Sequence, residues 1–111
     1  MPYQLQNLVL STIEEVKGED VVVLDIRQAS TFTDYMIIAT VQSARQANAL
    51  REKLLDRLKN ERVPILGIEG LQSSWTLIDC GTIVIHLMEP EARAYYNLEA
   101  LWDEDFAGET H

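Results

Sequence analysis

Residues 75–88 read WTLIDCGTIVIHLM and predict the centre of a β-sheet. Residues 75–79 and 82–88 are apolar and β-branched runs on either side of Gly81, which is the pattern of a β-hairpin. The rest of the chain can be assigned outward from this hairpin.

The register of the hairpin depends on the turn around Gly81. If Gly81 takes a left-handed position in a three-residue loop, five apolar side chains share one face, and Thr76, Ile78, Val84 and His86 lie on the other. The five are Trp75, Leu77, Ile83, Ile85 and Leu87. We expect this register because it separates polar from apolar side chains better. The alternative is a two-residue turn, which pairs Trp75 with His86.

The residues after the hairpin predict a helix that begins just after Pro90. Its amphipathic side chains surround the helix instead of forming one stripe, and they are Arg93, Tyr95, Tyr96, Glu99 and Trp102. Tyr, Trp and Arg are enriched at the centres of protein interfaces, so we expect this helix to be partly buried and partly contact surface. Arg93 and Glu99 are six residues apart, too far for a pair on one helix, so we expect each to find a partner elsewhere.

The first part of the chain predicts one helix and two strands. Residues 3–17 repeat apolar side chains at spacings of three and four, as an amphipathic helix does, and Gly18 ends the run. Residues 21–26 and 35–40 are apolar, β-branched runs separated by polar and small residues. We expect two neighbouring strands joined by a loop.

Ser43 begins a second predicted helix over residues 43–62. Its hydroxyl can accept a hydrogen bond from the amide of Gln46, whose side chain reaches back toward the helix start. The buried stripe of this helix comprises Ala47, Leu50, Leu54, Leu55 and Leu58. After Pro64, residues 65–68 predict a short third strand. This order of elements predicts the α/β class: a single domain with a mixed sheet of about five strands packed with helices.

Length and composition fit one domain, because the chain has 111 residues and 47% of them are hydrophobic. We place the domain at residues 1–102 and an acidic flexible tail at 103–111. The apolar runs are too short to cross a bilayer and the chain starts without a signal-peptide pattern, so we expect a cytoplasmic protein without membrane contact. The single cysteine, Cys80, cannot form an internal disulfide, which fits a reducing compartment.

The net charge of −9 is unevenly distributed. Residues 89–111 hold seven Asp and Glu against one Arg, whereas residues 43–62 hold six Lys and Arg against three acids. An acidic surface is repelled by the phosphates that supply most non-specific nucleic-acid affinity, so we expect no direct binding of free RNA or DNA. A basic protein is the expected partner of the acidic end.

Two long motifs carry a resemblance to a known family. The first is W-x-L-x-D-x-G-x-x-V-x-H at residues 75–86, followed by R-x-Y-Y-x-L-E-x-L-W at residues 93–102. The second is T-D-Y-M-I-I-A-T at residues 33–40, followed by S-x-x-Q at residues 43–46. Together they resemble the ribosomal silencing factor family, also called Iojap-like or RsfS proteins.

The resemblance covers residues 21–102 and implies a fold similar to that of nucleotidyltransferases. It also implies that the chain binds the large ribosomal subunit through the basic ribosomal protein L fourteen, blocks joining of the small subunit and so represses translation. One departure is Val41, where the family usually has glycine, and we expect the loop there to be reshaped.

By motif position, we expect a partner-binding patch of nine residues: Asp34, Tyr35, Trp75, Asp79, Arg93, Tyr95, Tyr96, Glu99 and Trp102. We expect no catalytic residue, cofactor or metal, because the sequence has no phosphate-loop, dinucleotide, zinc-protease or serine-hydrolase motif. We interpret His86 as a hydrogen-bonded sheet histidine and Cys80 as an inert turn thiol. An exposed strand edge leaves a homodimer open.

Two other functions remain open. A Mg²⁺-dependent enzyme of the nucleotidyltransferase type would use Asp25, Asp34 and Asp79, which fall near predicted strand ends. Asp25 is followed by Ile26 and Arg27 and not by a second nearby acid, so we expect these carboxylates to cap turns. A dimeric adaptor without a ribosomal role is the other alternative.

Overall fold

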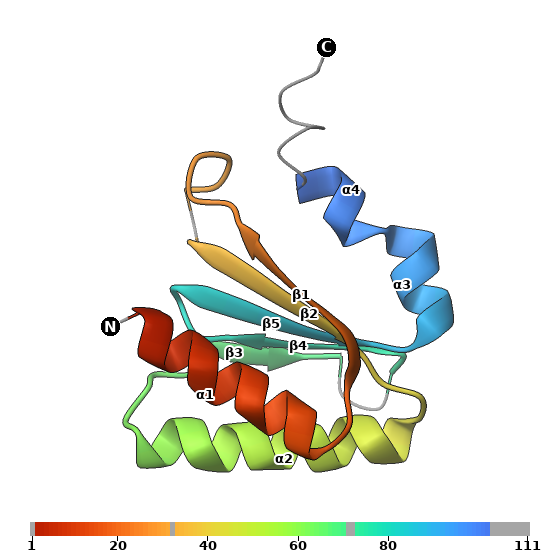
Figure 1. The fold of residues 1–111 in the computed structure, drawn as a ribbon, viewed down its shortest axis with the longest axis horizontal. Helices are drawn as coiled ribbons and strands as arrows, with labels where there is room; N and C mark the ends of the chain where they lie inside the picture. Colours follow the sequence, from red (N-terminus) through yellow and green to blue (C-terminus); the bar gives the residue numbers. More distant parts are fainter. Residues whose placement is uncertain (1, 32, 71–72, 103–111) are drawn as a thin grey trace.

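A computed structural model describes residues 2–31, 33–70 and 73–102 of the chain. The elements are α1 (Pro2–Glu15), β1 (Glu19–Asp25), β2 (Tyr35–Thr40), α2 (Ala44–Asn60), β3 (Gly67–Glu69), β4 (Trp75–Asp79), β5 (Ile83–Met88), α3 (Pro90–Tyr96) and α4 (Leu98–Trp102). The strands form one sheet in the order β1-β2-β5-β4-β3, in which β2 and β5 are parallel and the other pairs antiparallel (Figure 1). This arrangement confirms the predicted α/β domain with a mixed sheet of five strands.

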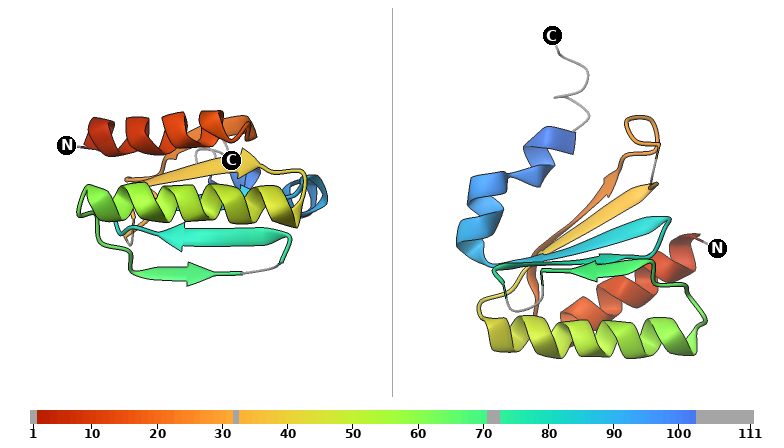
Figure 2. Two further views of the ribbon diagram at one scale, coloured as in Figure 1. Left: turned by 90° about the horizontal axis from the view of Figure 1, so that it is seen from below. Right: turned by 180° about the vertical axis from the view of Figure 1, so that it is seen from behind.

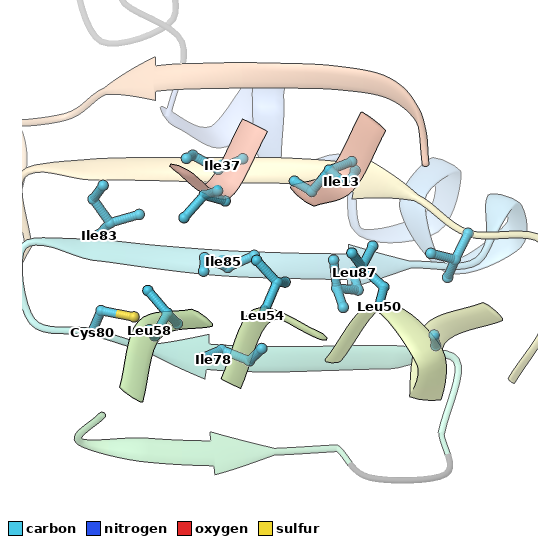
Figure 3. Packing of buried hydrophobic residues seen from close by; sticks show 14 residues of the cluster. Ile13, Ile37, Leu50, Leu54, Leu58, Ile78, Cys80, Ile83, Ile85 and Leu87 are labelled. Carbon is cyan, nitrogen blue, oxygen red and sulfur yellow. The ribbon is translucent and has the colours of Figure 1, made fainter. Parts of the chain in front are cut away.

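Helices α1 and α2 lie side by side on one face of the sheet (Figure 1 and Figure 2). Figure 3 shows helix side chains meeting sheet side chains in the main core. The helices contribute Ile13, Leu50, Leu54 and Leu58, and the sheet contributes Ile37, Ile78, Ile83, Ile85 and Leu87. Burial of each such side chain stabilises the folded state by about 1.5–3 kcal/mol. The two predicted amphipathic stripes are therefore confirmed.

The start of α2 follows the predicted capping pattern with one difference. The Ser43 hydroxyl accepts from the Gln46 amide at 3.1 Å, as expected. The Gln46 side chain, however, accepts from the amide of Gln42 at 2.7 Å, one residue before the cap. Its Nε2 also donates to the carbonyls of Val16 and Lys17, both at 3.0 Å. Gln46 thus caps α2 and ties it to the end of α1.

The preferred register of the β4–β5 hairpin is wrong. Trp75 pairs with Met88. The Cys80 amide donates to the Ile83 carbonyl at 2.9 Å, so only two residues form the turn, and Gly81 is one of them with a φ of 86°. The face toward α1 and α2 therefore carries Thr76, Ile78, Cys80, Ile83, Ile85 and Leu87.

The position of β5 explains this error. It is the central strand of the sheet, and all six of its residues are buried. A strand covered on both faces does not alternate apolar with polar side chains, so separation of polarity does not fix its register. Trp75 lies with His86 on the face away from α1 and α2, as the alternative register predicted, although the two are not direct partners.

The single helix predicted after Pro90 is also wrong, because it is two helices that meet at Asn97. Asn97 is left-handed, with φ 46° and ψ 57°, and its amide donates to the Arg93 carbonyl at 2.9 Å. Asparagine tolerates this conformation better than most residues. The resulting bend brings the Arg93 guanidinium to the Glu99 carboxylate at 2.8 Å, so these two are partners of each other, contrary to expectation.

Helices α3 and α4 lie on the opposite side of the sheet from α1 and α2 (Figure 1). A second, smaller core joins them to the sheet. It comprises Ile26, Met36, Ile38, Met88, Ala92 and Leu98, with Leu24 and Trp75 packed against it. The sheet therefore has helices on both faces, although the second face is covered by shorter ones.

Several other predictions concern the chain ends and Val41. Residues 103–111, the predicted tail, lie outside the described residues.

Val41 has a negative φ, is buried, and donates its amide to the Met88 carbonyl at 3.0 Å, so valine fits this loop without a left-handed backbone. Of the helices in the described ranges, none is both long and apolar enough to cross a bilayer. The likeness to nucleotidyltransferases stays a prediction.

Candidate functional site

Three aromatic side chains lie together on the face of the sheet that carries α3. Trp75 begins β4, and Tyr95 and Tyr96 end α3. The ring centroids of Trp75 and Tyr96 are 4.6 Å apart, and Tyr95 meets Tyr96 edge to face at 5.0 Å. Tyr95 is 82% exposed and Tyr96 51% exposed, whereas Trp75 is half-buried. These three residues, here called the aromatic cluster, present large apolar rings to solvent from regular elements.

His86 on β5 contacts the buried side of the aromatic cluster. The indole Nε1 of Trp75 donates to Nδ1 of His86 at 3.0 Å, and the two ring centroids are 5.8 Å apart. His86 is only 3% exposed, and this burial lowers its pKa to about 4, so the imidazole is neutral at pH 7. The expectation of a hydrogen-bonded sheet histidine is confirmed.

Arg93 and Glu99 are directed toward the protein and toward each other. Besides its ion pair with Glu99, the Arg93 guanidinium donates from Nη1 to the Thr40 hydroxyl at 2.8 Å. The Arg93 side chain is 12% exposed and that of Glu99 is 31% exposed. Arg93 therefore links α3 to the end of β2 and to α4. Trp102 ends α4, and its side chain lies outside the described part of the structure.

The remaining predicted residues gather at the β4–β5 turn. The amides of Asp34 and Tyr35 donate to the Thr82 carbonyl at 3.1 and 3.0 Å. The Asp79 carboxylate accepts from the Gly81 amide at 2.9 Å, which is the predicted turn-capping role. This turn lies at the opposite end of β4 from the aromatic cluster, about 13 Å along the strand. The nine predicted residues thus form two groups and not one continuous patch.

A hollow of about 850 Å³ opens at this turn, between α1, the end of α2 and the β4–β5 hairpin. Its walls mix charged, polar and apolar residues: Gln4, Leu5, Asn7, Leu8, Ser11, Asp34, Glu61, Arg62, Val63, Pro64, Cys80 and Thr82. Burial, followed by the nearby charge of Asp79, raises the pKa of the Cys80 thiol to about 11. The thiol is therefore protonated at pH 7, as expected for an inert cysteine.

The carboxylates proposed for an enzyme do not converge. Asp25 is held by Arg27 through hydrogen bonds of 2.9 and 2.7 Å, and these bonds lower the pKa of Asp25. The sheet register places the Asp25 side chain on the face toward α1 and α2 and the Asp79 side chain on the opposite face. Within residues 2–31, 33–70 and 73–102, no group of three His, Cys, Asp or Glu side chains is placed to hold a metal ion.

The family described as "Ribosomal silencing factor during starvation" matches residues 2–110, nearly the whole chain. The chain belongs to the ribosomal silencing factor family. Membership confirms the resemblance drawn from the two motifs.

Relatives within the ribosomal silencing factor family agree in sequence and in fold. "Ribosomal silencing factor RsfS" of Chromobacterium violaceum is 39% identical over 100 residues, covering 89% of this chain and 82% of that protein. The protein of that name in Haemophilus influenzae is 36% identical over 99 residues, covering 88% and 97%. A crystal structure of a Chromobacterium violaceum protein matches with a TM-score of 0.86 at 39% identity, covering 90% of this chain and 84% of that one.

A more distant relative is named for its role with a ribosome. "Mitochondrial assembly of ribosomal large subunit protein 1" of Mus musculus is 33% identical over 100 residues, covering 86% of this chain and 44% of that protein.

The roles of two residues in this candidate site were not predicted from the sequence. Thr40 was not expected to bind Arg93, and His86 was not expected to hold a residue of the predicted patch. Thr40 carries no local signal, because its contact depends on the bend at Asn97. The signal for His86 was present in the alternative hairpin register, which placed it on the same face as Trp75.

Proposed function

We propose that this chain binds the large ribosomal subunit through ribosomal protein L fourteen and blocks joining of the small subunit, so that translation is repressed. Membership of the ribosomal silencing factor family supports a ribosomal role. The observation that carries the proposed contact site is the exposed aromatic cluster of Trp75, Tyr95 and Tyr96.

The aromatic cluster has the properties of an interface centre. Tyr and Trp supply large contact area with few rotatable bonds, so they lose little entropy on binding. Tyr95 and Tyr96 stand on α3, which Arg93 fixes to β2 and α4 through two hydrogen bonds of 2.8 Å. Arg93 and Glu99 of the predicted patch therefore act here by holding α3, while the aromatic rings make the contact.

The charge of the chain supports a protein partner of opposite sign. The net charge is −9, and Glu91 is exposed on the helix that carries the two tyrosines. Acidic groups around an apolar centre speed the encounter with a basic protein and disfavour bare RNA. A basic ribosomal protein such as L fourteen fits these two conditions. The cytoplasm is the proposed site of action.

The dimensions of the molecule support exclusion by volume. The radius of gyration is 13.5 Å and the principal extents are 41 × 33 × 21 Å. A body of this size on the intersubunit face of the large subunit would occupy space that the small subunit needs. The proposed mechanism forms and breaks no covalent bond, so it needs no catalytic residue, cofactor or metal. A homodimer through an exposed strand edge stays a prediction.

Cosedimentation with purified large subunits tests the contact site. We expect Tyr96→Ala to weaken binding by about tenfold or more, because it removes an exposed ring from the centre of the cluster. Leu66→Ala is the matched control, since Leu66 is 67% exposed and lies near the β4–β5 turn. Equal binding of the wild-type chain and Tyr96→Ala would contradict the proposed contact site.

A further inference from the structure

His86 places a buried polar ring where an apolar side chain would pack without penalty. Its sheet neighbours are Ile38 on β2 and Leu77 on β4, and Val84 and Met88 flank it on the same face of β5. Among the described residues, its Nε2 has no hydrogen-bond partner although it is buried. An unpaired buried polar atom is costly, so packing does not explain the imidazole, and its hydrogen bond is made by the other nitrogen, Nδ1.

The hydrogen bond to Trp75 fixes the protonation state that this ring must have. Nδ1 accepts the indole N–H at 3.0 Å, so it carries no proton, and the single proton of the neutral ring must lie on the unpaired Nε2. In a charged imidazolium, Nδ1 would also carry a proton. It would then face the indole N–H as a second donor, and the hydrogen bond would be lost. The structure therefore requires a neutral His86 wherever the Trp75 indole is held in this orientation.

The surroundings keep the ring neutral through burial and not through a nearby charge. Charged and titratable groups on the elements around it are Tyr35 on β2, Glu69 on β3, Asp79 on β4, Glu91, Arg93, Tyr95 and Tyr96 on α3, and Glu99 on α4. Arg93 and Glu99 are paired with each other, and Asp79 binds the Gly81 amide at the far end of β4. Burial lowers the pKa of His86.

We propose that His86 is a positioning residue for ribosome binding: its neutral imidazole holds the Trp75 indole, and through it Tyr96 and Tyr95, in the orientation that meets the partner. The chain of contacts is continuous, from Nδ1 to the indole at 3.0 Å, from the indole to Tyr96 at 4.6 Å and from Tyr96 to Tyr95 at 5.0 Å. This inference rests on the proposed function of the aromatic cluster and adds a buried residue that touches no partner.

Two substitutions separate positioning from a purely structural role. His86→Asn keeps an acceptor, because its Oδ1 takes the place of Nδ1, but it buries an amide. His86→Leu removes the acceptor and fills the site with an apolar group. We expect His86→Leu to unfold at a temperature at or above that of His86→Asn, yet to bind large subunits about fivefold to tenfold more weakly than wild type. His86→Asn should restore most of that binding.

The Trp75 indole resonance provides a readout that needs no ribosome. In ¹⁵N-labelled protein, assigned by comparison with Trp102→Phe, we expect the Trp75 N–H signal of His86→Asn to stay close to wild type and that of His86→Leu to move. The proposal is overturned if the more stable of the two His86 variants is also the one that binds large subunits more tightly. It is also overturned if the Trp75 indole signal is the same in wild type, His86→Asn and His86→Leu. If the wild-type chain does not bind large subunits, the proposed function fails, while the indole signals still decide whether His86 orients Trp75.

Discussion

Trp75 connects the buried His86 to the exposed rings of the aromatic cluster. Inward, its indole donates to His86, and outward, its ring packs against Tyr96. A half-buried tryptophan held in this way presents its ring in one orientation, which lowers the entropy lost on binding. The chemistry of the site at the scale of single residues thus depends on a buried imidazole that remains neutral.

The lowered pKa of His86 predicts an acid-sensitive fold. Burial lowers this pKa from 6.5 to about 4, so between these values the unfolded chain binds a proton that the folded chain does not. Stability from this residue is complete above pH 6.5 and is lost as the pH falls toward 4, by about 3 kcal/mol in total. Urea unfolding of wild type and His86→Leu across this range measures the difference.

His86→Leu is the control for this titration because it keeps every other ionisable group. The Arg57 hydrogen bond lowers the pKa of Glu15 to about 2, and Arg27 lowers that of Asp25, but both effects are common to the two proteins. We expect the stability of wild type relative to His86→Leu to fall steadily between pH 6.5 and pH 4. Parallel stability curves would show that His86 does not titrate as described.

At the scale of elements, the bend between α3 and α4 determines the shape of the site. Asn97 takes a left-handed conformation there, and the bend brings Arg93 to Glu99. The last turn of α3, with its two tyrosines, is therefore fixed by contacts that a straight helix would not make. The geometry of the aromatic cluster depends on one residue with a positive φ.

Substitutions of Asn97 test this dependence. We expect Asn97→Gly to retain the stability of wild type, because glycine adopts a positive φ without strain. Asn97→Ala should cost about 1 kcal/mol, since a Cβ without a compensating polar group disfavours this conformation. Urea unfolding measures both variants. A fully stable Asn97→Ala would mean that α3 and α4 can join into one helix, contrary to the structure.

The elements differ in how well their sequences predict them. Strand β2 occurs at the predicted residues, and α2 begins directly after the predicted cap, Ser43, because an apolar β-branched run and a capping residue are local signals. The hairpin register was wrong because β5 is buried on both faces and carries no contrast between them. The bend at Asn97 was missed because asparagine is also compatible with a helix, and the contact of Arg93 with Thr40 and Glu99 stabilises the bend.

The sequence predicted which residues belong to the candidate site better than it predicted where they lie in the fold. The three residues of the aromatic cluster were named from the motifs and do lie together. Asp34, Tyr35 and Asp79 lie at the other end of β4, since the motif positions do not reveal which strand end each residue occupies. Long-range geometry of this kind follows from sheet topology, which no single segment specifies.

On the scale of the whole molecule, the sheet separates the main core from the proposed contact site. The face covered by α1 and α2 holds the main core, and the face covered by α3 and α4 holds the aromatic cluster. A change in the cluster can therefore alter binding without removing the main source of stability. This separation is what allows binding and folding to be measured independently in the variants described above.

Subunit joining is the most direct test of the proposed role. Purified large and small ribosomal subunits would be mixed under conditions that favour their association, with wild-type chain at the lowest concentration that saturates the large subunits or with Tyr96→Ala at that same concentration, and resolved by sedimentation through a sucrose gradient. We expect wild type to leave the subunits largely separate, and Tyr96→Ala to allow whole ribosomes to form. Whole ribosomes that form equally well with and without the wild-type chain would contradict the proposed function.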